Sequence, residues 1–200
     1  MRFRVLSATV VATACVTTAQ ADFIGLDLLD TPDILAGFID TSYDANTDAF
    51  LASGFALEID FDGSPPSPIA AGSFLLTATI NNVGDVLGGT LAVDGMVDGF
   101  GPSLLTGSLD DIGWDDNGGT LLEFLFTVTG GMLAGDYGGN GSQFGVILNL
   151  GSGMYTGDWR DSFATTSSSG TADIAPIPGP GALAAFAVAG GLIRRRRRSV

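Results

Sequence analysis

The sequence contains no histidine and no lysine, and its single cysteine is Cys15. Without histidine, Ser-His-Asp and Cys-His nucleophilic devices and histidine general bases are excluded. Without lysine there is no P-loop, no Schiff base and no lysine-dependent acylation of serine. With one cysteine and no histidine, an ordinary structural zinc site is excluded as well. We therefore expect no enzyme, and the one enzyme template that survives is a carboxylate pair acting on a glycosidic bond.

Positive charge is scarce outside the two termini. All 22 acidic residues lie between Asp22 and Asp173, and Arg160 is the only cation in that range, so this body carries a formal charge of −21. Nucleic acid and anionic membrane surfaces need a basic face, and neither is expected as a partner. Carboxylates attract divalent cations, which makes calcium the one candidate cofactor. No other cofactor is expected.

The N-terminus has the order of a secretory signal peptide. Two arginines precede an apolar run over 5–16, and Ala19 and Ala21 supply the small-x-small pattern that signal peptidase accepts. We expect a signal helix over residues 1–21, export through the general secretory route and cleavage after Ala21. Because Cys15 lies in this signal, the mature chain would have no thiol and no disulfide.

The C-terminus has the order of a short membrane anchor. A block rich in proline and glycine precedes an apolar run over 182–193, which ends at five arginines. Guanidinium groups are costly to move through hydrocarbon, so they should stay cytoplasmic. A helix over 180–193 would reach about 20 Å against a hydrocarbon core of about 30 Å, which suits a transient transmembrane helix in the inner membrane. The residues that define this tail are Pro176, Pro178, Gly179, Pro180, Gly181, Arg194, Arg195, Arg196, Arg197 and Arg198.

This order of signal peptide, glycine-rich body, proline motif, apolar helix and arginine cluster resembles the PEP-CTERM exported proteins of Gram-negative bacteria. The resemblance implies that segment 176–198 is a sorting tag recognised by exosortase, a membrane-embedded cysteine transpeptidase. It also implies removal of the tag near the proline motif, and release or attachment of the body outside the cell, often alongside exopolysaccharide. Where the family has Pro-Glu-Pro, this chain has Pro178-Gly179-Pro180, which leaves the position of cleavage open within 176–181.

The body over 22–164 is expected to form one β domain. Amphipathic helical periodicity is scarce, whereas short apolar or alternating runs recur between turn residues. This pattern predicts an all-β fold, an antiparallel β-sandwich or jelly roll, with a right-handed β-solenoid as the alternative. Residues 165–175, rich in serine and threonine, are predicted to link the body to the tag. The nine expected strands cover 23–29, 34–39, 50–61, 72–81, 90–97, 103–112, 120–129, 143–150 and 153–163.

Two acidic segments are candidate calcium sites. Residues 44–48 reproduce the D-x-N-x-D opening of an EF-hand-like loop, but the turn glycine and the bidentate glutamate of that loop are missing. Residues 110–119 place four aspartates around a tryptophan, next to a predicted hairpin turn. Ordinary turns capped by aspartate are the alternative for both segments. The candidate calcium ligands are Asp44, Asn46, Asp48, Asp111, Asp115 and Asp116.

Two tryptophans are candidates for contact with a glycan. An exposed indole beside carboxylates can stack on a sugar ring while the carboxylates accept from its hydroxyl groups. Trp114 lies among the aspartates of 110–119, and Trp159 precedes Arg160, which we expect to pair with a nearby carboxylate. The alternative is that both indoles belong to the core. Exposed, flat rings would favour glycan binding, and buried rings would favour a structural role.

Together these features predict a secreted or cell-surface protein with a structural or adhesive role and no catalysis. The alternative is a module that binds exopolysaccharide, assisted by calcium. A third reading is a glycan-active enzyme with two carboxylates, for which Glu58 and Glu123 are the only glutamates. The partners expected on export are signal peptidase and exosortase.

Overall fold

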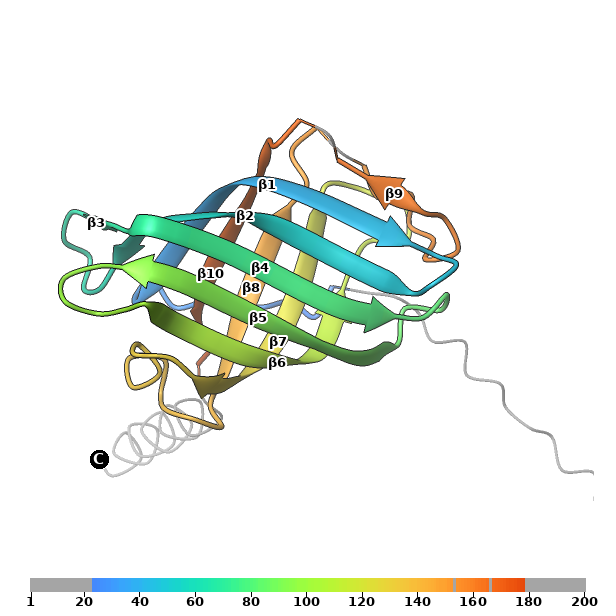
Figure 1. The fold of residues 1–200 in the computed structure, drawn as a ribbon. Helices are drawn as coiled ribbons and strands as arrows, with labels where there is room; N and C mark the ends of the chain where they lie inside the picture. The colour runs from blue at the N-terminus through green and yellow to red at the C-terminus, as the bar shows by residue number, and fades with distance from the viewer. Residues whose placement is uncertain (1–22, 153, 166, 179–200) are drawn as a thin grey trace, which may run out of the picture.

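The computed structural model describes residues 23–152, 154–165 and 167–178. These residues form antiparallel strands, and none of them is helical, so the all-β prediction is confirmed. The predicted signal helix and the tag from residue 179 onward lie outside the described residues, and within the described ranges no helix is long and apolar enough to cross a membrane. The strands, labelled in Figure 1, are β1 (Asp33–Asp44), β2 (Ala49–Asp60), β3 (Ser67–Pro68), β4 (Ala70–Ile80), β5 (Val86–Met96), β6 (Ser103–Gly113), β7 (Leu121–Gly130), β8 (Gln143–Asn149), β9 (Phe163–Ala164) and β10 (Gly170–Pro176).

Eight of the strands close into a barrel. Their order is β1-β2-β4-β5-β6-β7-β8-β10, and the ring closes because β1 pairs with both β2 and β10. The two-residue strands β3 and β9 pair with β2 and β1 outside this ring. The predicted sandwich or jelly roll is therefore wrong, because the strands pair edge to edge all the way round instead of splitting into two facing sheets.

Alternating side chains fill the barrel. On β4, Phe74, Leu76, Ala78 and Ile80 are buried, while the alternate residues 75, 77 and 79 turn outward. Phe126 and Phe144 stack across neighbouring strands with ring centroids 5.3 Å apart. A small residue also stands beside a large one in the interior. A Cβ added to Gly107 would lie 2.7 Å from the ring of Phe144, so the glycine leaves the space that this ring fills. The interior is thus a packed apolar core.

The predicted linker over 165–175 is wrong from residue 170 onward. Strand β10 pairs with β8 and β1 and closes the barrel. Its buried Ala172 and Ile174 alternate with the exposed Thr171 and Asp173, which is the pattern of a strand. The serine and threonine residues just before it favoured the prediction of a linker. Its last residue is Pro176, so the barrel ends at the first residue of the predicted tag.

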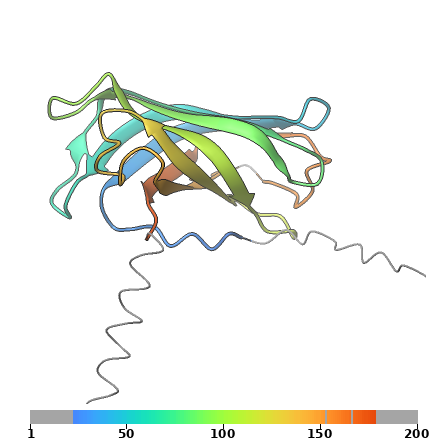
Figure 2. The same ribbon diagram turned by 90° about the horizontal axis from the view of Figure 1, so that it is seen from below.

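A segment before β1 crosses the outside of the barrel, and we call residues 23–32 the strap (Figure 2). The expected strand over 23–29 is not formed, although the residues alternate as predicted. Leu26 and Leu28 point to the barrel, where a Cβ added to Gly145 would lie 2.9 and 2.5 Å from their methyl groups. The missing side chain of Gly145 thereby makes a seat for the strap.

Candidate functional site

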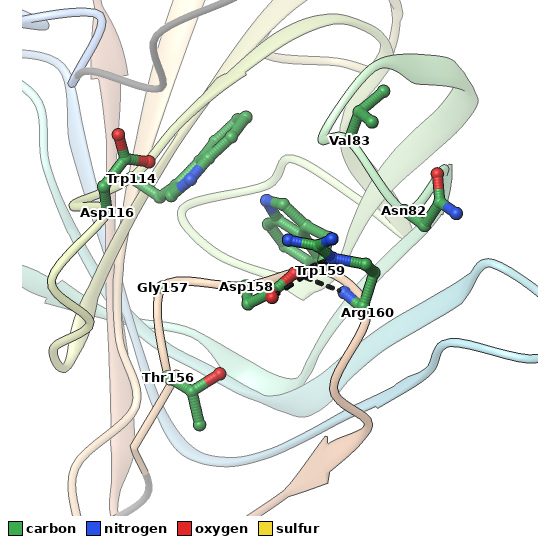
Figure 3. Close-up of a pocket in the computed structure, with 9 residues that line it drawn as sticks. All are labelled: Asn82, Val83, Trp114, Asp116, Thr156, Gly157, Asp158, Trp159 and Arg160. Atoms are coloured by element: carbon green, nitrogen blue, oxygen red, sulfur yellow. Dashed lines mark hydrogen bonds and ion pairs between the residues drawn. The ribbon is translucent and has the colours of Figure 1, made fainter.

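The two tryptophans named from the sequence meet in one pocket of about 460 Å³ at an end of the barrel (Figure 3). The turn between β4 and β5, the segment after β6 and the segment before β9 form its walls. The lining residues are Asn82, Val83, Trp114, Asp116, Thr156, Gly157, Asp158, Trp159 and Arg160.

An aromatic cluster forms the floor of this pocket. Trp159 is at its centre, with ring centroids 4.9 Å from Tyr43, 4.8 Å from Tyr155 and 5.6 Å from Trp114. The exposed fractions are 2% for Trp159, 1% for Tyr155 and 8% for Trp114. No ring offers an open face of the kind that stacks on a polysaccharide chain at a surface. The cluster closes this end of the barrel. This burial agrees with the alternative given for both tryptophans, that their indoles belong to the core.

The wall opposite the cluster is a turn that is fixed by its own side chains. Asn81 Oδ1 accepts hydrogen bonds from the N–H groups of Val83 and Asp85, at 3.0 and 2.9 Å. Gly84 adopts a φ of +89°, and an added Cβ there would lie 2.0 Å from the six-membered ring of Trp114. Only glycine allows the turn to lie so close to the indole. This turn was not among the candidate sites predicted from the sequence, although its Asn-Asn-Val-Gly-Asp sequence is a turn signal.

Two buried polar groups below the pocket lack a partner among the described residues. They are the indole Nε1 of Trp159 and the hydroxyl of Tyr155. Burial raises the pKa of Tyr155 far above its ordinary value, and the negative charges of Asp158 and Asp116 raise this pKa further. Tyr155 is therefore a neutral phenol, and both groups are donors that an acceptor would stabilise.

The rim of the pocket carries the one cation of the body. Arg160 Nε donates to Asp158 Oδ1 at 2.9 Å, as predicted from the sequence, and the backbone N–H of Arg160 donates to the same oxygen. These hydrogen bonds from Arg160 hold the pKa of Asp158 below its usual value. The side chain of Arg160 is largely exposed and that of Asp158 partly so, and water therefore screens the pair.

The candidate calcium ligands are divided between the last residue of β1 and the turn after it, the turn after β6, and strand β6 itself. Asp44 Oδ1 accepts from the backbone and side-chain amides of Asn46, and Asp115 Oδ1 accepts in the same way from Asn117. These bonds lower the pKa of both aspartates. Asp111 Oδ1 accepts from the N–H of the next residue, Ile112.

The acidic groups do not converge. Asp48 adopts a left-handed φ of +57° in the turn after β1, and Asp116 is the only candidate calcium ligand that lines the pocket. Among the residues that the structure describes, no three acidic side chains gather where one ion could touch them all. The turn chemistry that was the alternative to calcium accounts for the hydrogen bonds of Asp44 and Asp115.

The two glutamates lie on different strands, away from the pocket lining. Glu58 is on β2, and Glu123 is on β7, where its Oε2 accepts a hydrogen bond from Gly25 of the strap at 2.9 Å. Glu123 therefore holds the strap. The pocket itself brings together two other carboxylates, Asp116 and Asp158, and the second of these is paired with Arg160.

No family model, curated protein or solved structure matches this chain.

Proposed function

We propose that this protein is exported to the cell surface or the extracellular matrix, where it serves a structural or adhesive role without catalysis. An N-terminal signal directs the export, and exosortase removes the C-terminal tag after a transient stay in the inner membrane. The body then remains outside the cell.

One observation carries this proposal. The ring of eight strands is complete at Pro176, where the predicted tag begins, and among the described residues Ile177 and Pro178 follow it outside any strand. Cleavage after these residues would therefore leave every strand of the ring in place. The burial of Trp114, Tyr155 and Trp159 supports a structural role for the body, because these side chains stabilise the core.

Mass spectrometry of the mature protein tests the processing. We expect a product that starts at Asp22 and lacks the five arginines at 194–198. A variant with glutamine at all five positions should lose the membrane stop and escape processing, while a variant of the exposed Asp62 should be processed normally. A secreted wild-type protein that still carries the arginines would refute the proposal.

A second candidate function is the binding of exopolysaccharide in the pocket, and one observation favours it. Both tryptophans line the same cavity with Asp116, Asn82 and Thr156, a mixture of apolar faces, donors and acceptors that suits a sugar residue.

Intrinsic fluorescence tests this second candidate directly, because the only two tryptophans of the chain line the pocket. Neutral oligosaccharides from a glycan panel should change the emission of the wild type. The variant Asp116→Ala should weaken the response several-fold, whereas Asp62→Ala, in another turn, should not. An unchanged spectrum across the panel would remove this candidate.

A further inference from the structure

The C-terminal half of the strap meets the last residues of β10 at the end of the barrel opposite the pocket. The N–H of Leu29, in the strap, donates to the carbonyl of Pro176 at 2.9 Å. Pro176 is buried and forms the last pair of the β8–β10 ladder, with Phe144. We call this contact between the strap and residues 176–178 the clasp, and Figure 2 shows the strap passing beside the end of β10.

The strap and the residue after β10 share one seat. A Cβ added to Gly145 would lie 2.5 Å from the side chain of Leu28 and 3.6 Å from that of Ile177. Both side chains therefore lie over the same notch on β8. Ile177 and Pro178 are half-buried, and they line a second pocket of about 560 Å³ together with Leu29.

A buried tyrosine holds the same strand from the other side. Tyr137, in the loop between β7 and β8, donates its hydroxyl to the carbonyl of Ile174 at 2.8 Å. Its side chain is 1% exposed. Residues 174–178 are thus held by the ladder, the strap and this loop together.

We propose that the clasp sets the boundary of C-terminal processing, so that the enzyme cuts at the Pro178–Gly179 bond or beyond it. An enzyme that cleaves a peptide bond must reach the two residues that flank that bond, and for the bonds on either side of Ile177 these include residues that the clasp holds. Drawing out residues 176 and 177 would break the ladder pair with Phe144, the bond from Leu29 and the contact of Ile177 at Gly145. Segments with several such contacts open rarely.

The physiological reaction rests on the proposed function, but the protection is a property of the barrel alone. In that reaction one peptide C–N bond breaks. The carbonyl carbon of the body is transferred to water or to an amine acceptor, and the tag leaves with a new amino terminus. The position of this bond, which the sequence leaves open within 176–181, is therefore decided by the fold.

Limited proteolysis of the full-length protein with proteinase K tests the protection. Intact-mass analysis should show a resistant fragment that ends at residue 178 or later. Circular dichroism recorded on the same sample shows whether the barrel is folded. A folded fragment that ends between residues 173 and 177 would overturn the inference.

A matched pair of strap variants sharpens this test. Leu29→Pro removes the N–H that binds Pro176, and we expect cleavage within 174–177 to become about tenfold faster while the barrel stays folded. Asp27→Pro places the same ring two residues away, at an exposed position with no bond to β10, and should leave the boundary unchanged. If the resistant fragments of the two variants ended at the same residue, the clasp would not set the boundary of cleavage.

The mature protein from cells separates the two proposals. A body that ends before residue 178 and is still folded would contradict the clasp and agree with processing of the tag. A secreted protein with an intact tag would contradict processing, while the proteolysis result would still decide the clasp.

Discussion

The two ends of the barrel are closed by different means. At the pocket end, side chains from the loop before β9 stack over the core, with Trp159 at the centre of an aromatic cluster. At the clasp end, the loop between β7 and β8 packs Tyr137 against Phe144, and the strap lies on the outside of the barrel, seated on Gly145 and tied to Pro176. The aromatic cluster around Trp159 includes no residue of the C-terminal segment, whereas the clasp includes residues 176–178 themselves. C-terminal processing should therefore affect only the clasp end.

Removal of the central indole should have the largest effect. Trp159→Ala deletes a buried side chain that contacts several other rings, and we expect a loss of about 3–5 kcal/mol in the free energy of unfolding. Urea denaturation followed by far-ultraviolet circular dichroism measures it. The exposed Phe55 on β2 provides the control, because Phe55→Ala should change stability by less than about 0.5 kcal/mol. Equal effects of the two variants would show that Trp159 does not hold this end together.

A side chain in the strap seat should have a smaller effect, limited to the clasp end. Gly145→Val would place a methyl-bearing carbon 2.5 Å from Leu28, and we expect the strap to be displaced at a cost of about 1–3 kcal/mol. Proteolysis should then cut within 23–32 before it cuts the barrel. At Gly119 an added Cβ would meet no atom within 4 Å, so Gly119→Ala is the control. If the strap of Gly145→Val stayed protected from proteolysis, the space left by Gly145 would not be what positions the strap.

Near the clasp end, stability should depend on pH through Asp33. Burial, together with the hydrogen bond and negative charge of Asp173 and the charge of Asp60, raises the pKa of Asp33 to about 7. The folded protein therefore prefers the protonated carboxyl. This contribution to stability is present at low pH and is lost as the pH rises through about 7.

The variant Asp33→Asn should therefore be more stable than the wild type at pH 8, by about 1 kcal/mol after allowance for solvent screening of a half-buried group. At pH 4 the gain should disappear, because the wild-type carboxyl is then protonated. Urea midpoints at the two pH values measure the difference. A gain for Asp33→Asn that is equal at both pH values would contradict the assignment.

The rim of the pocket should contribute least. Arg160 is largely exposed and its partner Asp158 partly so, and Arg160→Ala should therefore leave the melting temperature unchanged within error. The comparison with Trp159→Ala then separates the charged rim from the aromatic floor. A fall of several degrees for Arg160→Ala would mean that the ion pair positions the loop before β9.

Several strands could be read from the sequence because the period of two is strong in them. The expected run over 120–129 is observed as β7 at Leu121–Gly130, with apolar residues that point into the core. Strand β10 was missed because serine and threonine in 165–171 suggested a linker, although Ala172 and Ile174 keep the alternation. The strap was predicted as a strand, but its N–H groups find few partners beyond Glu123 and Pro176.

The candidate site, too, could be predicted only in part from the sequence. The sequence singled out Trp114 and Trp159, but it did not show that they share one pocket or that both are buried. The opposite wall, formed by Asn82 and Val83, comes from a turn more than 70 residues away from Trp159 in the chain. Local pattern contains no information on such long-range neighbours.

By itself, the sequence determined the excess of negative charge, the absence of histidine and lysine chemistry, and the alternation that makes β-strands. These are local properties, fixed by composition and by the geometry of a single strand. Tertiary structure decided that the sheet closes into a barrel, that the tryptophans are buried, and that Pro176 belongs to the folded body. Each of these depends on which distant strands pair and on how much space a glycine leaves between them, and only the folded chain determines those distances.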